Sequence, residues 1–189
     1  MTPLKYFTIF LKDKLYDSIR FNNSSEDYLG RFYGEFMSYS GGDGQTLGIV
    51  LTPKHITDLF CKLADLKDDD IVLDPCCGTG GFLISAMHEM VQKIKESNIG
   101  ENSKQNKIKN IKQKQLHGIE LQPYMFTIAT TNMILRGDGK SNIINENFLS
   151  QESGTLQLKQ ANVGMMNPPY SQGSSQILIF MNYHLQNIF

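Results

Sequence analysis

The sequence predicts an α/β fold in which a partial parallel sheet follows a small helical segment. Short apolar runs alternate with helical patterns after residue 52, and a glycine-rich turn joins one apolar run to a helix. Residues 1–40, in contrast, carry apolar side chains at helical spacing. Alternating strands and helices are typical of domains with a central parallel sheet. We therefore divide the chain into a helical N-terminal segment, residues 1–47, and a partial α/β domain, residues 48–189.

Two amphipathic helices are expected in residues 1–40. Apolar side chains recur every three or four residues on both sides of a turn-like run, Asn22-Asn23-Ser24-Ser25, which is the period of a helix face. Ser25 is suited to begin the second helix, because its side chain can cap backbone N–H groups and acidic residues follow it. The glycines of residues 40–44 then end the pattern.

The sequence pattern of residues 48–189 predicts three helices and four strands. The helices begin at Thr52-Pro53, Phe82 and Pro123, and end near Lys67, Lys95 and Arg136. The strands are expected at residues 71–73, 115–120, 142–145 and 163–166. Ile71-Val72-Leu73 is apolar throughout, which fits a strand that is buried on both faces. Residues 92–115 hold seven Lys and few apolar residues, so we expect a solvated insertion there.

Composition excludes several classes of protein. The 18 basic and 19 acidic residues give a net charge of −1, so any affinity for DNA must come from a local patch or a partner. No apolar run is long enough to cross a membrane, and the N-terminus lacks the layout of a signal peptide. The three cysteines show no pairing or metal-ligand spacing, which argues against disulfides and zinc. We expect a cytoplasmic protein with no membrane partner and no metal.

The run Asp74-Pro75-Cys76-Cys77-Gly78-Thr79-Gly80-Gly81 lies at a strand-to-helix junction, where open α/β sheets bind ligands. It matches neither the dinucleotide fingerprint nor the phosphate-binding loop. The carboxylate of Asp74 would repel a pyrophosphate but suits a ligand with an amino group. S-adenosylmethionine has an α-amino group and a sulfonium and no phosphate, so it is the expected cofactor. Glu120 closes the next strand, where a carboxylate can accept hydrogen bonds from ribose hydroxyls.

The tetrad Asn167-Pro168-Pro169-Tyr170 follows the last predicted strand. Its two prolines fix the backbone and present carbonyl oxygens rigidly, and the side chain of Asn167 adds another acceptor. The exocyclic amine of a base is a poor nucleophile, because its lone pair is delocalised into the ring. Two acceptors, Asn167 and the Pro168 carbonyl, would localise that lone pair. The ring of Tyr170 would stack on a base taken out of the duplex.

Together these motifs resemble the amino-group (N6-adenine) DNA methyltransferases, most closely the modification subunit of type I restriction-modification enzymes. The resemblance is carried by residues 29–36, 48–54, 74–82, 132–137 and 167–170. It implies a Rossmann-like S-adenosylmethionine-dependent methyltransferase fold. It also implies adenine-specific methylation of double-stranded DNA, with specificity (S) and restriction (R) subunits as partners.

The resemblance also implies the site residues. The cofactor would be held by Leu51, Thr52, Pro53, Asp74, Gly78, Thr79, Gly80, Gly81, Glu120, Asn147 and Phe148. The target adenine would be held by Asn167, Pro168, Pro169 and Tyr170.

The chain is expected to be an incomplete methyltransferase domain. It supplies matches to only the first strands of the family's sheet, and residues 174–189 do not resemble the family's continuation. We therefore expect a cofactor half-site with little activity on its own. Three alternatives stay open: a protein glutamine methyltransferase with the same tetrad, an inactive partner-binding module, and N4-cytosine methylation.

Overall fold

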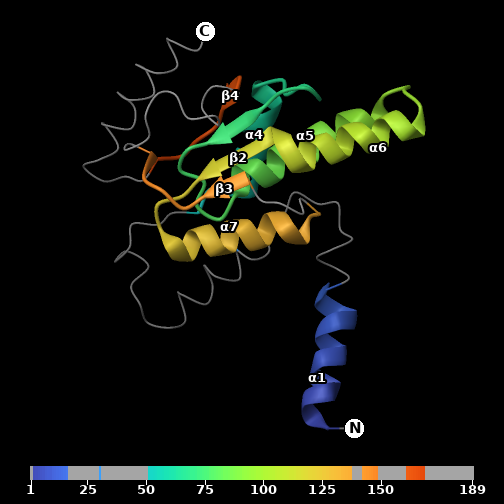
Figure 1. Ribbon diagram of the computed structural model, residues 1–189, viewed down its shortest axis with the longest axis vertical. Coiled ribbons are helices and arrows are strands. Elements are labelled where there is room, and N and C mark those ends of the chain that lie inside the picture. The colour runs from blue at the N-terminus through green and yellow to red at the C-terminus, as the bar shows by residue number, and fades with distance from the viewer. Residues whose placement is uncertain (1, 17–29, 31–50, 138–141, 149–160, 169–189) are drawn as a thin grey trace.

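The computed structural model describes residues 2–16, 30, 51–137, 142–148 and 161–168. A parallel sheet lies at its centre, with helices packed against it (Figure 1). The strands are β1 (Val72–Asp74), β2 (Leu116–Ile119), β3 (Asn142–Ile144) and β4 (Val163–Gly164). Their order is β3-β2-β1-β4, and every neighbouring pair is parallel. The predicted α/β class and the four strands are confirmed.

The strand order places a change of direction between β1 and β4, the strand at one edge of the described sheet. The chain steps from β1 outward to β2 and β3, and then returns to the opposite side of β1 as β4. Leu73 of β1 is in register with His117 of β2 and with Gly164 of β4. The carboxyl ends of β1 and β4 therefore flank a topological switch point, which is where ligands bind in open α/β sheets.

Three helices build the main core together with the sheet. They are α4 (Lys54–Leu63), α5 (Gly81–Glu96) and α7 (Pro123–Leu135). Leu83, Ile84 and Met90 of α5 are buried against Val72 and Leu116 of the sheet. Each such side chain contributes about 1.5–3 kcal/mol through the burial of apolar surface. The core thus fixes the start of α5 relative to the ends of β1 and β2.

A smaller cluster lies on the other face of the sheet. Leu73 and Ile119 alternate with the core residues of their strands, and successive side chains of a strand point to opposite faces. They pack with Phe148 and Ala161. Both faces of β1 and β2 are therefore buried, and for β1 the apolar run Ile71-Val72-Leu73 predicts this.

The helix α4 differs from its prediction. It ends at Leu63 instead of Lys67, and Pro53 precedes the helix as its N-cap. The apolar Leu59 and Leu63 are 48% and 74% exposed, whereas Thr57 and Cys61 are buried. The reason is a polar contact between helices: the hydroxyl oxygens of Thr57 and Ser85 of α5 lie 2.7 Å apart.

The lysine-rich insertion is helical, which the composition did not indicate. It forms α6 (Glu101–Asn110) and a π-helical turn, η2 (Ile111–Gln115). Ile108 and Ile111 pack against the core from this segment. Because they are one helical turn apart, they favour a helix, while the lysines of α6 remain at the surface.

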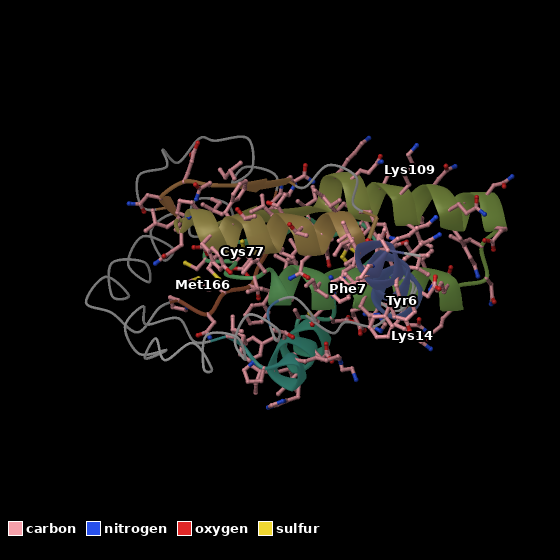
Figure 2. The ribbon with its side chains drawn as sticks, turned by 90° about the horizontal axis from the view of Figure 1, so that it is seen from below. Tyr6, Phe7, Lys14, Cys77, Lys109 and Met166 are labelled. Carbon is pink, nitrogen blue, oxygen red and sulfur yellow. The ribbon has the colours of Figure 1, made fainter. Side chains whose placement is uncertain are left out.

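The N-terminal segment is described only in part. The helix α1 (Pro3–Leu11) is followed by a π-helical turn, η1 (Lys12–Tyr16). The helix α1 extends away from the sheet (Figure 1). It carries the exposed aromatic residues Tyr6 and Phe7 (Figure 2). The second predicted helix lies outside the described residues except for Gly30, so the boundary at residue 47 stays a prediction. Within the described ranges, every helix is too short or too polar to cross a membrane.

Candidate functional site

The polar residues predicted for the site gather at the carboxyl edge of the sheet. Asp74 ends β1, Glu120 follows β2, and Asn167 comes three residues after β4. The backbone N–H of Met165 donates to the carbonyl of Leu73 at 2.9 Å, which continues the pairing of β4 with β1. Asn167 therefore leaves the sheet beside the end of β1. Cys77 and Met166 lie on the same side of the molecule, away from Lys109 of α6 (Figure 2).

The glycine-rich turn is held by backbone hydrogen bonds. The N–H of Cys77 donates to the carbonyl of Ile119 at 3.0 Å, and the N–H of Gly80 donates to the carbonyl of Cys77 at 2.7 Å. Gly78 and Gly80 have φ values of +56° and +86°. Residues other than glycine rarely adopt this left-handed backbone conformation. The turn therefore needs glycine at both positions.

The surroundings of the two glycines differ. A Cβ added at Gly80 would lie 3.7 Å from the Cβ of Ala129 in α7, which is ordinary contact. A Cβ added at Gly78 would meet no atom within 4 Å. Gly80 therefore lets the turn pack on α7, while Gly78 borders open space that a ligand can approach.

Glu120 connects the glycine turn to the segment after β2. Its Oε2 accepts a hydrogen bond from the N–H of Gly78 at 2.8 Å, and its Oε1 accepts one from the N–H of Gln122 at 2.8 Å. Burial raises the pKa of this carboxyl, and the backbone donors of Gln122, Gly78 and Leu121 oppose that rise. Each carboxylate oxygen has a second lone pair, so both remain able to accept a hydroxyl donor.

Asp74 is a buried carboxyl at the centre of the site. Its side chain is 1% exposed, and its Oδ1 accepts a hydrogen bond from the N–H of Cys76 at 3.1 Å. Burial raises its pKa to about 8, and the charge of Glu120 adds to the rise. No basic side chain among the described residues forms an ion pair with it. A cationic group bound nearby would stabilise its ionised form.

Asn167 is tied to the segment that begins α4. Its Nδ2 donates to the Oγ1 of Thr52 at 3.0 Å, across 115 positions of sequence. The side chains of Asn167, Thr52 and Pro168 are all half-buried. Because Nδ2 is bound to Thr52, Oδ1 is the atom of this amide that remains for a donor from outside. Pro169 and Tyr170, the rest of the tetrad, lie outside the described residues.

The other predicted residues take different positions. Leu51 is half-buried, and Pro53 and Asn147 are exposed. Phe148 is buried against Leu73 and Ile119 at the ends of β1 and β2. In the described ranges, no group of three or more metal-ligating side chains lies together.

Two polar contacts behind the site involve residues outside the predicted set. The Nδ2 of Asn132 in α7 donates to the carbonyl of Thr79 at 2.9 Å. The Oγ of Ser85 donates to Oδ1 of Asp58 at 2.8 Å, and Asp58 also pairs with Lys54. An Asn among the apolar positions of a buried helix face is the signal that points to the first contact, because a buried amide needs hydrogen-bond partners.

The sequence model of the N-6 DNA methylase family matches residues 24–184. The type II restriction enzyme and methyltransferase RM.BcgI of Heyndrickxia coagulans is 50% identical over 175 residues, which cover 93% of this chain and 26% of that protein. The methylase subunit of the type I restriction enzyme EcoEI of Escherichia coli is 28% identical over 156 residues, 82% of this chain and 30% of that subunit.

A solved structure shares the fold. A modification subunit of a type I restriction enzyme from Vibrio vulnificus YJ016 matches with a TM-score of 0.59 and 23% identity, over 78% of this chain and 29% of that one. The chain thus spans between a quarter and a third of the length of these proteins. The match supports the predicted Rossmann-like arrangement.

Proposed function

Because the chain belongs to the N-6 DNA methylase family, we propose that it forms the cofactor-binding half of an adenine-N6 DNA methyltransferase and part of its target site. The observation that supports the proposal is the hydrogen bond between Asn167 and Thr52, because Asn167 follows β4, the neighbour of the strand that ends at Asp74. Residues from three distant parts of the sequence meet there. The resemblance to modification subunits, inferred from the motifs, agrees with this family.

S-adenosylmethionine is the cofactor that the residues of this edge suit. Asp74 is a buried carboxyl without a basic partner among the described residues, and an α-amino group would supply the missing positive charge. The open space at Gly78 adjoins the carboxylate of Glu120, which would accept hydrogen bonds from a ribose. When bound, the cofactor would supply a methyl group activated by its sulfonium. Gly80, Gly81 and Thr79 would shape the turn around it, with Leu51, Pro53, Asn147 and Phe148 at its rim.

The target amine would be bound by the tetrad. The Oδ1 of Asn167 and the carbonyl of Pro168 would accept the two hydrogens of the adenine amino group. This holds the lone pair of N6 out of the ring and directs it toward the methyl group. The bond to Thr52 fixes which end of the Asn167 amide faces the base. Pro169 and Tyr170 would complete the pocket, with the tyrosine ring stacked on the extruded base.

The partners follow from the same proposal. The substrate would be double-stranded DNA. The relatives include methylase subunits of type I restriction enzymes, so specificity (S) and restriction (R) subunits are the proposed protein partners. A net charge of −1 fits a chain that relies on partners for most of its DNA affinity. Methylation of genomic DNA would place the protein in the cytoplasm.

Two measurements test the proposal. Calorimetry should show binding of S-adenosylhomocysteine to the 189-residue chain, and Asp74→Asn should weaken it. Mass spectrometry of DNA incubated with the chain, S-adenosylmethionine and an S subunit should find N6-methyladenine at a low level, as expected of half a methyltransferase, and Asn167→Ala should abolish it. N4-methylcytosine in the DNA, or methylated glutamine in a peptide substrate, would contradict the proposal. Glu101→Gln, an exposed change on α6, is the matched control.

A further inference from the structure

We propose that Asn132 is a positioning residue for cofactor binding: from within α7 it fixes the peptide between Thr79 and Gly80. The inference rests on the proposed cofactor site and names a residue to which no role in it is assigned. Asn132 is 0% exposed, yet it lies on the apolar face of α7 between Ala129 and Met133. A polar side chain at such a position is costly unless its hydrogen bonds are satisfied.

The amide of Asn132 is held at both ends. Its Nδ2 donates to the carbonyl of Thr79 at 2.9 Å. The Nη1 of Arg136 donates to its Oδ1 at 3.1 Å and to its backbone carbonyl at 3.0 Å. Because a guanidinium has no acceptor, the oxygen of the amide must face Arg136 and the nitrogen must face Thr79. Arg136 thus sets the orientation of the group that holds the turn.

The contact with Thr79 helps to hold the peptide bond between Thr79 and Gly80 in one orientation. The carbonyl of Thr79 and the N–H of Gly80 belong to the same peptide bond, which is planar. Asn132 binds the carbonyl, and the carbonyl of Cys77 binds the N–H at 2.7 Å. Neither end can then turn without breaking a hydrogen bond.

The residues that hold the glycine turn all come from the segment that runs from the end of β2 through α7. Gly78 donates to Glu120, Thr79 accepts from Asn132, and Gly80 packs against Ala129. Ala129 and Asn132 are three residues apart, so they lie on the same face of the helix. The positions of Gly78, Thr79 and Gly80 are therefore fixed by one segment of the chain. The same segment carries Glu120, the carboxylate proposed to bind the ribose. Asn132 would keep the glycine turn at a fixed position relative to the carboxylate of Glu120.

The variant Asn132→Asp tests this role, because it keeps the size of the side chain and removes the donor. An oxygen facing the Thr79 carbonyl would turn the peptide away. We expect S-adenosylhomocysteine to bind about tenfold more weakly by calorimetry, as a lost buried hydrogen bond implies. Arg136→Lys should weaken binding in the same direction and by less.

Met133→Ala is the matched control. Met133 is the next residue of α7 and is fully buried in the core, but its thioether carries no donor that could bind the carbonyl of Thr79. Its cavity should lower thermal stability more than Asn132→Asp does, while affinity for S-adenosylhomocysteine stays within about twofold. Equal loss of affinity in both variants would show a merely structural role for Asn132 and overturn the proposal.

Hydrogen exchange gives a readout that does not need the ligand. The amide of Gly80 should exchange at least about tenfold faster in Asn132→Asp, relative to amides of β2, as expected for a local opening. Met133→Ala should speed the exchange of the Gly80 amide and of the β2 amides by the same factor. If the unmodified chain binds no S-adenosylhomocysteine, the proposed cofactor is wrong, and exchange at Gly80 alone decides the role of Asn132. Unchanged exchange in Asn132→Asp would overturn it.

Discussion

The Oε2 of Glu120 accepts a hydrogen bond from the backbone N–H of Gly78 at 2.8 Å, although the two residues are 42 positions apart. This bond joins the acid that follows β2 to the glycine turn that follows β1. The side chain that we assign to the ribose therefore also shapes the turn. A change at Glu120 should affect the cofactor site in two ways at once.

Glu120→Gln should weaken binding of S-adenosylhomocysteine at least tenfold. The amide has only one oxygen, so it cannot accept from both Gly78 and Gln122, and its NH2 group would face one of those donors. Lost hydrogen bonds to a charged group cost about 1.5–3 kcal/mol. Calorimetry at pH 7 measures the affinity. An affinity equal to that of the Glu101→Gln control would contradict the assignment.

Asp74 should make the protein less stable as the pH rises. Burial raises its pKa from the ordinary value of 3.8 to about 8 in the folded chain, so the folded state binds the proton more tightly. The stabilisation is complete below about pH 4 and is lost as the pH rises toward 8. Burial also raises the pKa of Glu120, which gives a slope of the same sign. Urea unfolding between pH 5 and 8 should show this decline, and Asp74→Asn should flatten it. Stability that rises with pH over this range would contradict the burial of Asp74.

Binding of S-adenosylmethionine should release protons near pH 7. A cation close to Asp74 favours the ionised carboxylate and lowers its pKa. Calorimetry in buffers with different ionisation enthalpies measures the number of protons released. Asp74→Asn should reduce that number. Proton uptake on binding would rule out a cationic group beside Asp74.

Gly78→Ala and Gly80→Ala should differ in their effect on the cofactor. Both residues have positive φ, so alanine should cost about 1–2 kcal/mol of stability at either position. Only at Gly78 does the new methyl group enter open space beside Glu120. Gly78→Ala should therefore weaken S-adenosylhomocysteine binding more than Gly80→Ala does. Equal affinities in the two variants would place the ligand elsewhere.

Thr52→Val should loosen the start of the tetrad. Valine has the shape of threonine without the hydroxyl that accepts the bond from Asn167. Unfolding by urea should show a loss of about 0.5–1.5 kcal/mol, and adenine methylation by the chain with an S subunit should slow. Thr52→Ser keeps the hydroxyl and serves as the control. A serine variant as impaired as the valine variant would point to packing instead of the hydrogen bond.

The fold and part of the site were predictable from local patterns. The apolar run before Asp74 predicts β1, and the glycines after it predict the turn, because both depend on neighbours in the sequence. The exposed apolar side of α4 was not predictable. Apolar spacing alone would bury Leu59 and Leu63, but the side of the helix that faces α5 carries Thr57, whose hydroxyl oxygen lies 2.7 Å from that of Ser85.

The sequence by itself determined the α/β class, the order of the four strands and of α4, α5 and α7, and the acids and amide at the strand ends. It did so because strand and helix periods and the chemistry of Asp74, Glu120 and Asn167 are properties of short segments. The tertiary structure alone decided that Asp74 is buried and that Asn132 holds the turn. Both facts depend on atoms brought together from distant positions, where burial sets the pKa and leaves a buried amide only certain partners.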